Sequence, residues 1–249
     1  MPNPAGNYPG RQIFLGRLSN AQYAFAYFGS GRSPASQQRY ATPFISEESA
    51  IRIKPLNATE TFDPFRHYQA VRVNKETGLV VVSNSQAPND PLYEMYTFSS
   101  PEEKRRDLTA RVLGVIGPEY DNPSKPTSRV TGILFPTTDQ SFGAVLGISA
   151  ARGTGHQHLF EPRAGEMKWV STYNGNVEYE NFDPQKLVRG ETIYVPRATN
   201  ARDLANEIYD ASTYVHEKYG ELRVWALAGV HTGNGPGGWD LFTRNRFNP

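Results

Sequence analysis

The sequence predicts an α+β protein in which antiparallel sheets are covered by helices. Segments with the apolar alternation of strands recur along the whole chain of 249 residues, and several come in pairs joined by turn sequences. Only two long segments have helical spacing, and they do not alternate with the strands. Because a doubly wound parallel sheet requires such alternation, a layered fold of antiparallel sheets is favoured.

The expected strands are spread over the whole chain. Around Ile51 and Ile53, apolar residues alternate with basic ones, which is the period of a half-buried strand. Ser19 and Asn20 fall in a turn between the first two strands, and Gly78 is placed for a positive φ between two others, so both pairs are predicted hairpins. The strand-like segments are residues 13–18, 21–28, 49–56, 68–73, 78–84, 128–135, 141–149, 168–173, 191–196, 223–230 and 239–244.

Residues 100–117 carry the clearest helix signals in the chain. Ser100 is a candidate N-cap, Pro101 suits the first helical position, and Glu103 stands at the capping-box position. Gly117 and the proline after it end the helix. The apolar face is expected to consist of Leu108, Val112 and Val115.

Residues 200–220 predict a second helix. Asn200 is its N-cap candidate, and Gly220 fits the C-terminal stop. Its apolar stripe is expected to consist of Leu204, Ile208, Ala211 and Val215.

Composition and charge exclude several classes of protein. A formal net charge of +1 gives no global field for nucleic acid, and no apolar run of about 18 residues exists to cross a membrane. Cysteine is absent, which excludes disulfides and thiol catalysis. The N-terminus lacks the apolar core of a signal peptide, so a soluble cytoplasmic protein is expected. Residues 1–11, rich in Pro and Gly, are expected to be a flexible lead-in to a single domain of residues 12–249.

Two further motifs have simple interpretations. His156 and His158 would share one face of a strand, but no third ligand has matching spacing, so a solvated loop is favoured and no metal is expected. The glycine-rich residues 231–239 lack the Lys-Ser/Thr ending of a phosphate loop. They predict a turn between the last two strands, with a mobile loop near a ligand as the alternative. The chain has no local signature of a covalent nucleophile.

Several arginines lie within or near the ends of predicted strands. Guanidinium groups bind phosphate through two parallel hydrogen bonds, so arginines at such places are candidates for anion binding. Spacing alone nevertheless favours a surface charge or an ion-pair partner for any one of them. These arginines are Arg17, Arg32, Arg39, Arg129 and Arg244.

Two polar residues flank the second predicted hairpin. If residues 74–78 form its turn, Tyr68 and Asn84 lie at the same open end of the sheet. Taken alone, Tyr68 is interpreted as a core residue and Asn84 as a turn residue.

Five segments occur in the order and approximate spacing of a known family. They are "IFLGRL…AYFGSGRSPASQQR", "YQAVRV…GLVVVSNSQ", "KPTSRVTGIL", "WVSTY" and "GWDLFTR". Together they resemble the archaeal-type IMP cyclohydrolase family from about residue 12 to the C-terminus. The chain departs from the family in its lead-in and in a longer stretch from Pro136 to Trp169.

The resemblance implies a four-layer αββα fold similar to that of the N-terminal nucleophile hydrolases. It implies an enzyme of the hydrolase class, an IMP cyclohydrolase, which closes the purine ring of 5-formamidoimidazole-4-carboxamide ribonucleotide with loss of water. The implied ligand is a small purine ribonucleotide, and the reaction needs no cofactor, metal or covalent intermediate. Assembly into a homo-oligomer is also implied.

The resemblance also implies catalytic residues. Arg32 would hold the 5′-phosphate or the oxyanion that develops on the formyl group. Tyr68 would donate a proton to the formyl group or polarise it. Asp121 is the candidate carboxylate base, with Glu119 as an equal alternative.

Five further residues are implied to bind the substrate. Arg17 or Arg129 would add positive charge, and Ser33 would add a hydrogen-bond donor. Asn84 would orient the carboxamide, and Tyr173 would stack on or hydrogen-bond the imidazole.

Two other functions remain open for the same fold. One is a sensor that binds a purine nucleotide without turning it over. The other is an amide hydrolase, which would need Ser, Thr or Cys at a processed N-terminus, and no such residue opens the first matched strand.

Overall fold

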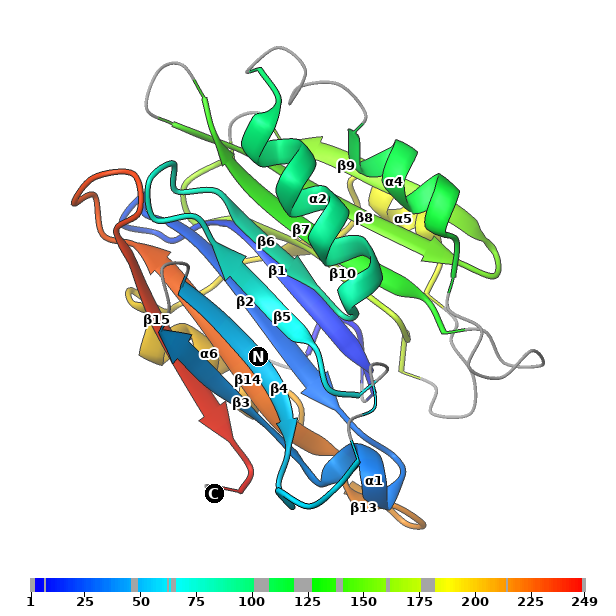
Figure 1. The fold of residues 1–249 in the computed structure, drawn as a ribbon. Coiled ribbons are helices and arrows are strands. Elements are labelled where there is room, and N and C mark those ends of the chain that lie inside the picture. The colour runs from blue at the N-terminus through cyan, green and yellow to red at the C-terminus, as the bar shows by residue number, and fades with distance from the viewer. Residues whose placement is uncertain are drawn as a thin grey trace.

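Two large antiparallel sheets, a small hairpin and a few helices make up the protein, so the predicted α+β class is confirmed (Figure 1). The computed structural model describes residues 3–6, 8–45, 49–61, 63, 66–100, 108–118, 127–137, 141–159, 162–175, 182–213 and 215–247.

Each large sheet is antiparallel throughout. The first has the strand order β11 (Ile193–Tyr194), β10 (Met167–Ser171), β1 (Arg11–Arg17), β2 (Tyr23–Ser30), β14 (Arg223–His231) and β15 (Trp239–Asn245). The second has the order β3 (Arg39–Ile45), β4 (Ser49–Pro55), β5 (Gln69–Val73), β6 (Val80–Ser83), β7 (Arg129–Pro136), β8 (Phe142–Ala150) and β9 (Gly153–Leu159). The small hairpin consists of β12 (Val215–His216) and β13 (Gly220–Glu221).

The two large sheets pack face to face. Strand β1 lies against β7 and β8, and strand β15 lies against β3. The approach is close at Gly132, where a Cβ atom would stand 2.8 Å from Cγ2 of Ile13. The largest cluster of buried apolar side chains fills the space between the sheets.

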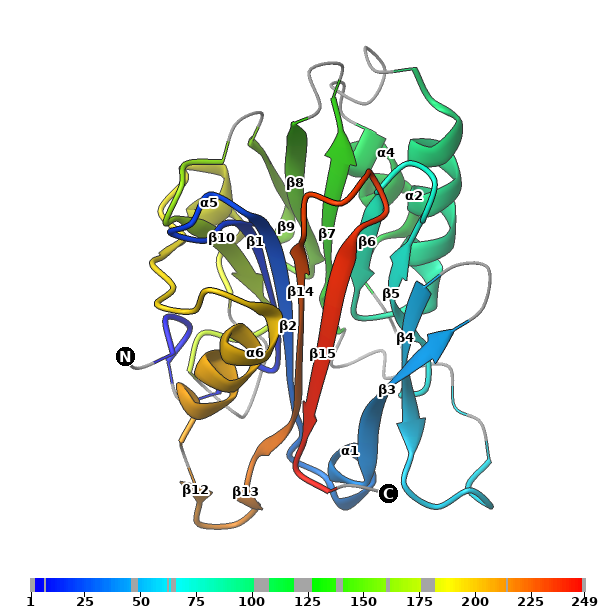
Figure 2. The ribbon, with the colours of Figure 1, turned by 90° about the vertical axis from the view of Figure 1, so that its left-hand side faces the viewer.

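Helices cover the outer faces of the sheets (Figure 2). Two cover the outer face of the seven-stranded sheet, and one packs on β2, β14 and β15 of the other sheet. A short one packs on β8 and β9 from the side of the core between the sheets, to which its Leu187 belongs. In that order they are α2 (Gln86–Phe98), α4 (Leu108–Ile116), α6 (Ala201–Asp210) and α5 (Pro184–Val188), and a further short helix, α1 (Pro34–Gln37), follows β2.

The apolar run of strand β6 reflects its position between two layers. Val80 and Val82 join the core between the sheets, whereas Val81 joins the core beneath α2 and α4. Both faces of the strand are therefore buried, which explains a continuous apolar segment in an antiparallel sheet.

Most of the predicted local structure is confirmed. Strands β1 and β2 form the first predicted hairpin, and β5 and β6 form the second, with Gly78 at φ +80°. The N-cap predicted at Asn200 is present, because its Oδ1 accepts a hydrogen bond from the backbone N–H of Asp203 at 2.9 Å. The glycine-rich residues 231–239 include the turn between β14 and β15.

The second predicted helix is too long. Helix α6 ends at Asp210, and the residues expected to continue it form β12 and β13. Val215, expected on the buried stripe, is 63% exposed, and Gly220 has φ +68° beside the tight turn of the small hairpin. The glycine therefore marks a hairpin and not the end of a helix.

The first predicted helix is present as α4, with one correction. Leu108 and Val112 are buried as expected, but Val115 is 89% exposed and does not belong to the apolar face. Gly117 follows the helix with φ +67°. The start expected at Ser100, with its capping box, involves residues 101–107, which lie outside the described residues.

Three further elements of seven residues or more differ from the prediction or were missed. The segment of His156 and His158, expected to be a solvated loop, is the edge strand β9. Strand β3 was missed because Pro43 argues against a strand, although proline is tolerated at a sheet edge. Helix α2 was missed because its buried aliphatic and aromatic residues, Leu92, Tyr93 and Tyr96, follow a proline-containing start.

The segment before β1, expected to be a flexible lead-in, is tied to the domain. The side-chain amide of Asn3 donates to Oε1 of Gln12 and to Oγ of Ser212, both at 2.8 Å. Ala5 and Tyr8 are buried.

Within the described ranges, no helix is long and apolar enough to cross a bilayer.

Candidate functional site

A cavity of about 370 Å³ opens at one end of both large sheets. Its walls come from the starts of β1, β5 and β7 and from the ends of β2, β6 and β10. The residues that line it are Tyr8, Gly10, Arg11, Ser30, Gly31, Arg32, Ser33, Ser36, Arg66, Asn84, Thr127, Thr172 and Tyr173.

The lining is cationic and rich in hydroxyl groups. Arg11, Arg32 and Arg66 contribute guanidinium groups, and no carboxylate lines the cavity among the residues that the structure describes. Guanidinium and hydroxyl donors suit an anionic oxygen ligand such as a phosphate. The cavity therefore has the chemistry of an anion site.

Two glycines bring backbone to the cavity wall. Gly10 has φ +68°, and a Cβ atom there would stand 2.3 Å from Oγ1 of Thr172. A Cβ atom at Gly31 would stand 2.6 Å from the carbonyl oxygen of Ser36. Neither wall has room for a side chain at these positions, so glycine is required for the shape of the cavity.

The loop after β2 forms one wall and is fixed by its own side chains. Oγ of Ser33 accepts from the backbone N–H of Ser36 at 3.1 Å, and Oγ of Ser36 accepts from the N–H of Ser33 at 2.9 Å. The Arg32 guanidinium lies 5.8 Å from the ring centre of Tyr173, which packs edge-on against Tyr8 at 4.8 Å.

Arg11 connects the cavity to a group of buried phenols. Its guanidinium donates to the carbonyl of Ser30, and the phenol of Tyr68 lies close enough to act on its charge. The hydroxyls of Tyr68 and Tyr27 are 2.8 Å apart. Burial acts to lower the pKa of Arg11, but the phenols of Tyr68, Tyr27 and Tyr8 outweigh it and raise the pKa. Burial raises the pKa of Tyr27 well above its ordinary value, so this phenol stays protonated at neutral pH.

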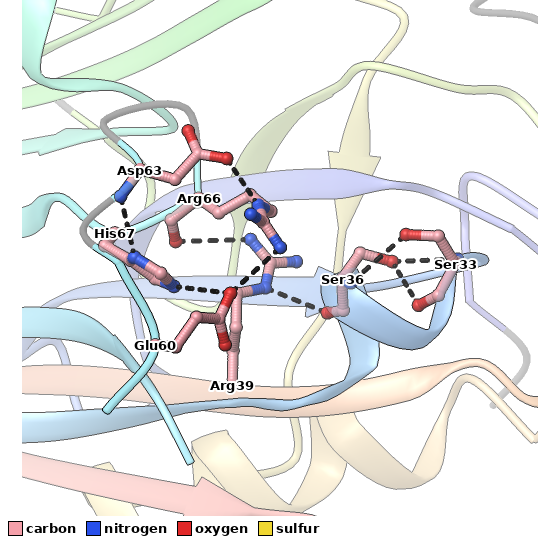
Figure 3. A network of polar contacts seen from close by, with 7 residues as sticks. All are labelled: Ser33, Ser36, Arg39, Glu60, Asp63, Arg66 and His67. Carbon is pink, nitrogen blue, oxygen red and sulfur yellow. Dashed lines mark hydrogen bonds and ion pairs between the residues drawn. The ribbon is translucent and has the colours of Figure 1, made fainter. Parts of the chain in front are cut away.

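Arg66 and Arg39 join two walls of the cavity (Figure 3). The Arg66 guanidinium is paired with Asp63 at 2.5 Å and with Glu60 at 3.1 Å. The side chain of Arg39 is fully buried. Its Nε donates to the carbonyl of Ser36 at 2.8 Å, and its Nη1 donates to the carbonyl of Arg66 at 3.4 Å.

His67 holds the same segment in place. Its Nδ1 accepts from the backbone N–H of Asp63 at 3.0 Å, so the neutral ring carries its proton on Nε2, which lies 3.8 Å from Oε1 of Glu60. Burial lowers the pKa of His67. The histidine is therefore neutral at pH 7 and supports the loop that presents Arg66.

Four of the residues predicted from the sequence line the cavity: Arg32, Ser33, Asn84 and Tyr173. The amide of Asn84 is held by the start of β7, because its Nδ2 donates to the carbonyl of Ser128 and its Oδ1 accepts from the N–H of Val130. One N–H and one lone pair of this amide are not used by these bonds.

Tyr68 lies one step behind the cavity. It is buried, it contacts the lining through Arg11, and it lines a second cavity of about 470 Å³ together with His67 and Arg52. Tyr68 and Asn84 do lie at the same open end of the β5–β6 hairpin, as the sequence predicts.

Two predicted arginines lie away from the lining. Arg17 stands at the opposite end of β1 from Arg11, where its Nε donates to the carbonyl of Ala21 at 2.9 Å. Arg129 donates to the carbonyls of Ile116 and Gly117, which end helix α4, both at 3.2 Å. The candidate bases Asp121 and Glu119 fall outside the described residues.

Sequence reasoning missed several lining residues, above all Arg11 and Arg66. Arg11 was assigned to the lead-in, although it opens the first strand. Arg66 stands two residues before Tyr68, at a strand start that was already of interest. The sequence analysis considered arginines within strands and at their ends as candidates for anion binding. Considering the residues at and before the start of each strand in the same way would have found both.

The fold and the site together define the class of protein. It is an α+β protein with two facing antiparallel sheets and a cavity lined by arginines and hydroxyl groups where strands of both sheets end. The model of a family described as IMP cyclohydrolase-like protein matches residues 8–230. The chain therefore belongs to the IMP cyclohydrolase-like family, which confirms the resemblance drawn from the sequence and relates its role to IMP cyclohydrolase. A comparison with curated proteins gives no match.

Proposed function

We propose that the protein is an IMP cyclohydrolase that closes the purine ring of 5-formamidoimidazole-4-carboxamide ribonucleotide. The carboxamide nitrogen attacks the formyl carbon and forms the new C–N bond. The carboxamide nitrogen gives one proton to the formyl oxygen, and the resulting carbinolamine loses its hydroxyl group as water together with the proton of the formamido nitrogen. Since both reacting groups belong to one molecule, positioning, charge stabilisation and proton transfer are the contributions that the protein has to make.

The lining of the cavity is the observation that carries this proposal. Three guanidinium groups and several hydroxyls converge where strands of both sheets end, and family membership makes a purine nucleotide the expected ligand. A nucleoside monophosphate offers the anionic oxygens that such a lining binds.

We assign the reacting end of the substrate to the Arg11 side of the cavity. Tyr68 would act through the neighbouring Arg11, which in turn would face the formyl oxygen as that oxygen gains negative charge. Asp121 or Glu119 is retained as the candidate base from the sequence alone. Arg17 and Arg129 are left out of the proposed site because neither lines the cavity.

The opposite wall would bind the rest of the nucleotide. Arg32 and Ser33 would hold the 5′-phosphate together with Arg66. Asn84 would act at the reacting end, where its remaining N–H and lone pair would orient the carboxamide. Tyr173 would pack on the imidazole. Each charge-assisted hydrogen bond of this kind contributes about 1.5–3 kcal/mol when well placed.

The proposal extends to the fold and the setting of the protein. We propose that the two sheets and their covering helices form the four-layer αββα arrangement of the N-terminal nucleophile hydrolases, without a processed nucleophile. A cytoplasmic location and a homo-oligomeric state remain predictions from the sequence.

The decisive experiment is a spectrophotometric time course with purified protein and the formamido ribonucleotide, with and without a chelator. We expect formation of IMP at the same rate in both samples, and a large loss of turnover in Arg32→Ala with the fold retained. Binding of the nucleotide by calorimetry without turnover would instead identify a sensor. Full activity of both Arg32→Ala and Tyr68→Phe would contradict the site assignment.

A further inference from the structure

The guanidinium groups of Arg39 and Arg11 lack a counter-ion in the described part of the chain. Arg39 is fully buried, and its Nη2 has no hydrogen-bond partner among the described residues. Its other two nitrogens donate to backbone carbonyls, which carry no full charge. Neither Arg39 nor Arg11 forms an ion pair with a described carboxylate, and burial raises the pKa of the nearby phenols of Tyr8 and Tyr27, which are therefore neutral at pH 7.

The positive charges of the two guanidinium groups also repel each other. Burial and the neighbouring charge of Arg11 together lower the pKa of Arg39 to about 9. Arg39 therefore remains protonated at neutral pH in a place where its charge is unfavourable. Buried charges are retained when a partner compensates them, so the missing partner is expected to be a ligand.

The position of Arg39 suits a residue that acts from behind the cavity wall. It does not line the cavity, but it binds the carbonyls of Ser36 and Arg66, two residues that do (Figure 3). Its charge thus reaches the anion site through low-dielectric protein rather than through water, which weakens screening.

We infer that Arg39, from behind the Ser36 and Arg66 walls, makes the cavity selective for a doubly charged phosphate monoester over singly charged and neutral analogues. Arg39 is a positioning residue in this inference: it sets the spacing of the Ser36 and Arg66 walls and supplies a second buried charge. The inference rests on the proposed function, in which the ligand is a nucleoside monophosphate.

The first test uses the wild-type protein and three ligands of decreasing charge. Calorimetry at pH 8 compares IMP, which is a dianion, with its 5′-phosphate methyl ester, which is a monoanion, and with inosine, which is neutral. We expect IMP to bind at least about tenfold more tightly than the ester, as one further charge near a partly screened cation pair predicts. Equal affinities for IMP and the ester would overturn the inference.

The second test separates charge from shape. In Arg39→Gln the ratio of the IMP and ester affinities should fall to less than about threefold, because the buried charge is gone. Arg39→Lys should keep most of the ratio, since it keeps the charge. Arg197→Gln, which removes an exposed arginine charge outside the cavity, should leave the ratio unchanged.

A merely structural role for Arg39 predicts a different result. Arg39→Gln would then lower the melting temperature and weaken all three ligands in proportion, with the ratio unchanged, and the inference would be wrong. If Arg39→Gln does not fold, the wild-type ratio and Arg39→Lys decide the question. Failure of the proposed function appears separately, as an absence of turnover in a protein whose binding ratio is still measurable.

Discussion

Arg11 and Arg17 stand at the two ends of strand β1, and only Arg11 lines the cavity. Their Cα atoms are about 20 Å apart in an extended strand of this length, so at most one of them can reach a given ligand. The choice between them depends on where the neighbouring strands end. At the scale of single residues, the composition of a segment is therefore less informative than its position relative to other strand ends.

The first prediction concerns the phenols beside Arg11. Tyr68→Phe should lower kcat about 100-fold or more and change KM by less than about threefold, because proton transfer or polarisation is lost while binding is kept. Tyr27→Phe also removes the hydrogen bond between Tyr27 and Tyr68, but it leaves the contact of Tyr68 with Arg11. The loss of kcat in Tyr27→Phe should therefore be smaller. Steady-state kinetics of both variants tests this. Equal losses, or a change confined to KM in Tyr68→Phe, would contradict the role given to Tyr68.

The second prediction concerns the backbone at the cavity wall. Gly10→Ala combines a positive φ with a clash against Thr172, whereas Gly233→Ala has a similar φ and no atom within 4 Å. We expect Gly233→Ala to lower the free energy of unfolding by about 1 kcal/mol, and Gly10→Ala to lower it by about 3 kcal/mol or more. Denaturant titration measures both losses, and calorimetry with IMP should find weaker binding only in Gly10→Ala. Similar behaviour of the two variants would mean that the wall yields to a methyl group.

At the scale of elements, the local sequence predicts where helix α6 starts but not where it ends. The cap of helix α6 follows from Asn200 alone, but the end of that helix at Asp210 does not. Ala211 and Val215 have the spacing to continue its apolar stripe, yet Val215 lies in β12 and is exposed. Before β5, the ion pairs of Glu60 and Asp63 hold Arg66, which lines the cavity, and His67 accepts from the N–H of Asp63.

The third prediction concerns His67 in this segment. Burial lowers its pKa below the ordinary value of 6.5, with Arg66 and Arg39 acting in the same direction and Glu60 and Asp63 opposing it. Below pH 6.5 the unfolded chain thus binds more protons than the folded one, so the contribution of His67 is present above pH 6.5 and is lost as pH falls through the lowered pKa.

We therefore expect the wild type to lose more stability between pH 7 and about pH 5 than His67→Gln, in which nothing titrates at this position. Gln retains an oxygen that can accept from the N–H of Asp63, which makes it the matched substitution. Denaturant titration at both pH values tests this. Parallel losses in the two proteins would assign the acid sensitivity to other groups.

At the scale of the whole molecule, the site depends on two sheets held in one relative position. Strands of both sheets supply its walls, and a side chain links the edge strands of the two sheets directly. Oδ1 of Asn245 on β15 accepts from the N–H of Ala41 on β3 at 2.7 Å, and its Nδ2 donates to the carbonyl of Ala41 at 2.9 Å. Ala41 lies two residues after Arg39, so this link also fixes the strand that carries Arg39.

The fourth prediction tests that link. Asn245→Ala leaves the N–H and the carbonyl of Ala41 without these partners, which should lower the free energy of unfolding by about 2 kcal/mol. Asn245→Asp keeps the acceptor and loses the donor, so its loss should be intermediate at neutral pH. Thermal and denaturant unfolding measure both. A loss below about 0.5 kcal/mol in Asn245→Ala would mean that the sheets are held together by their apolar core alone.

The sequence by itself determined the α+β class, the two hairpins, the cap at Asn200 and the family to which the chain belongs. These features are encoded in periodicity, turn residues and motif order, each of which depends on a few neighbouring residues. It also led to Arg32, Ser33, Asn84 and Tyr173, which line the cavity.

Only the tertiary structure decided that Arg11 and Arg66 belong to the lining, that Arg17 does not, and that Arg39 is buried behind it. The reason is physical: strands β1 and β10 pair although about 150 residues separate them in the chain, and no local pattern specifies which strand ends then meet. A guanidinium group is a surface charge or part of a binding site according to what that pairing places around it.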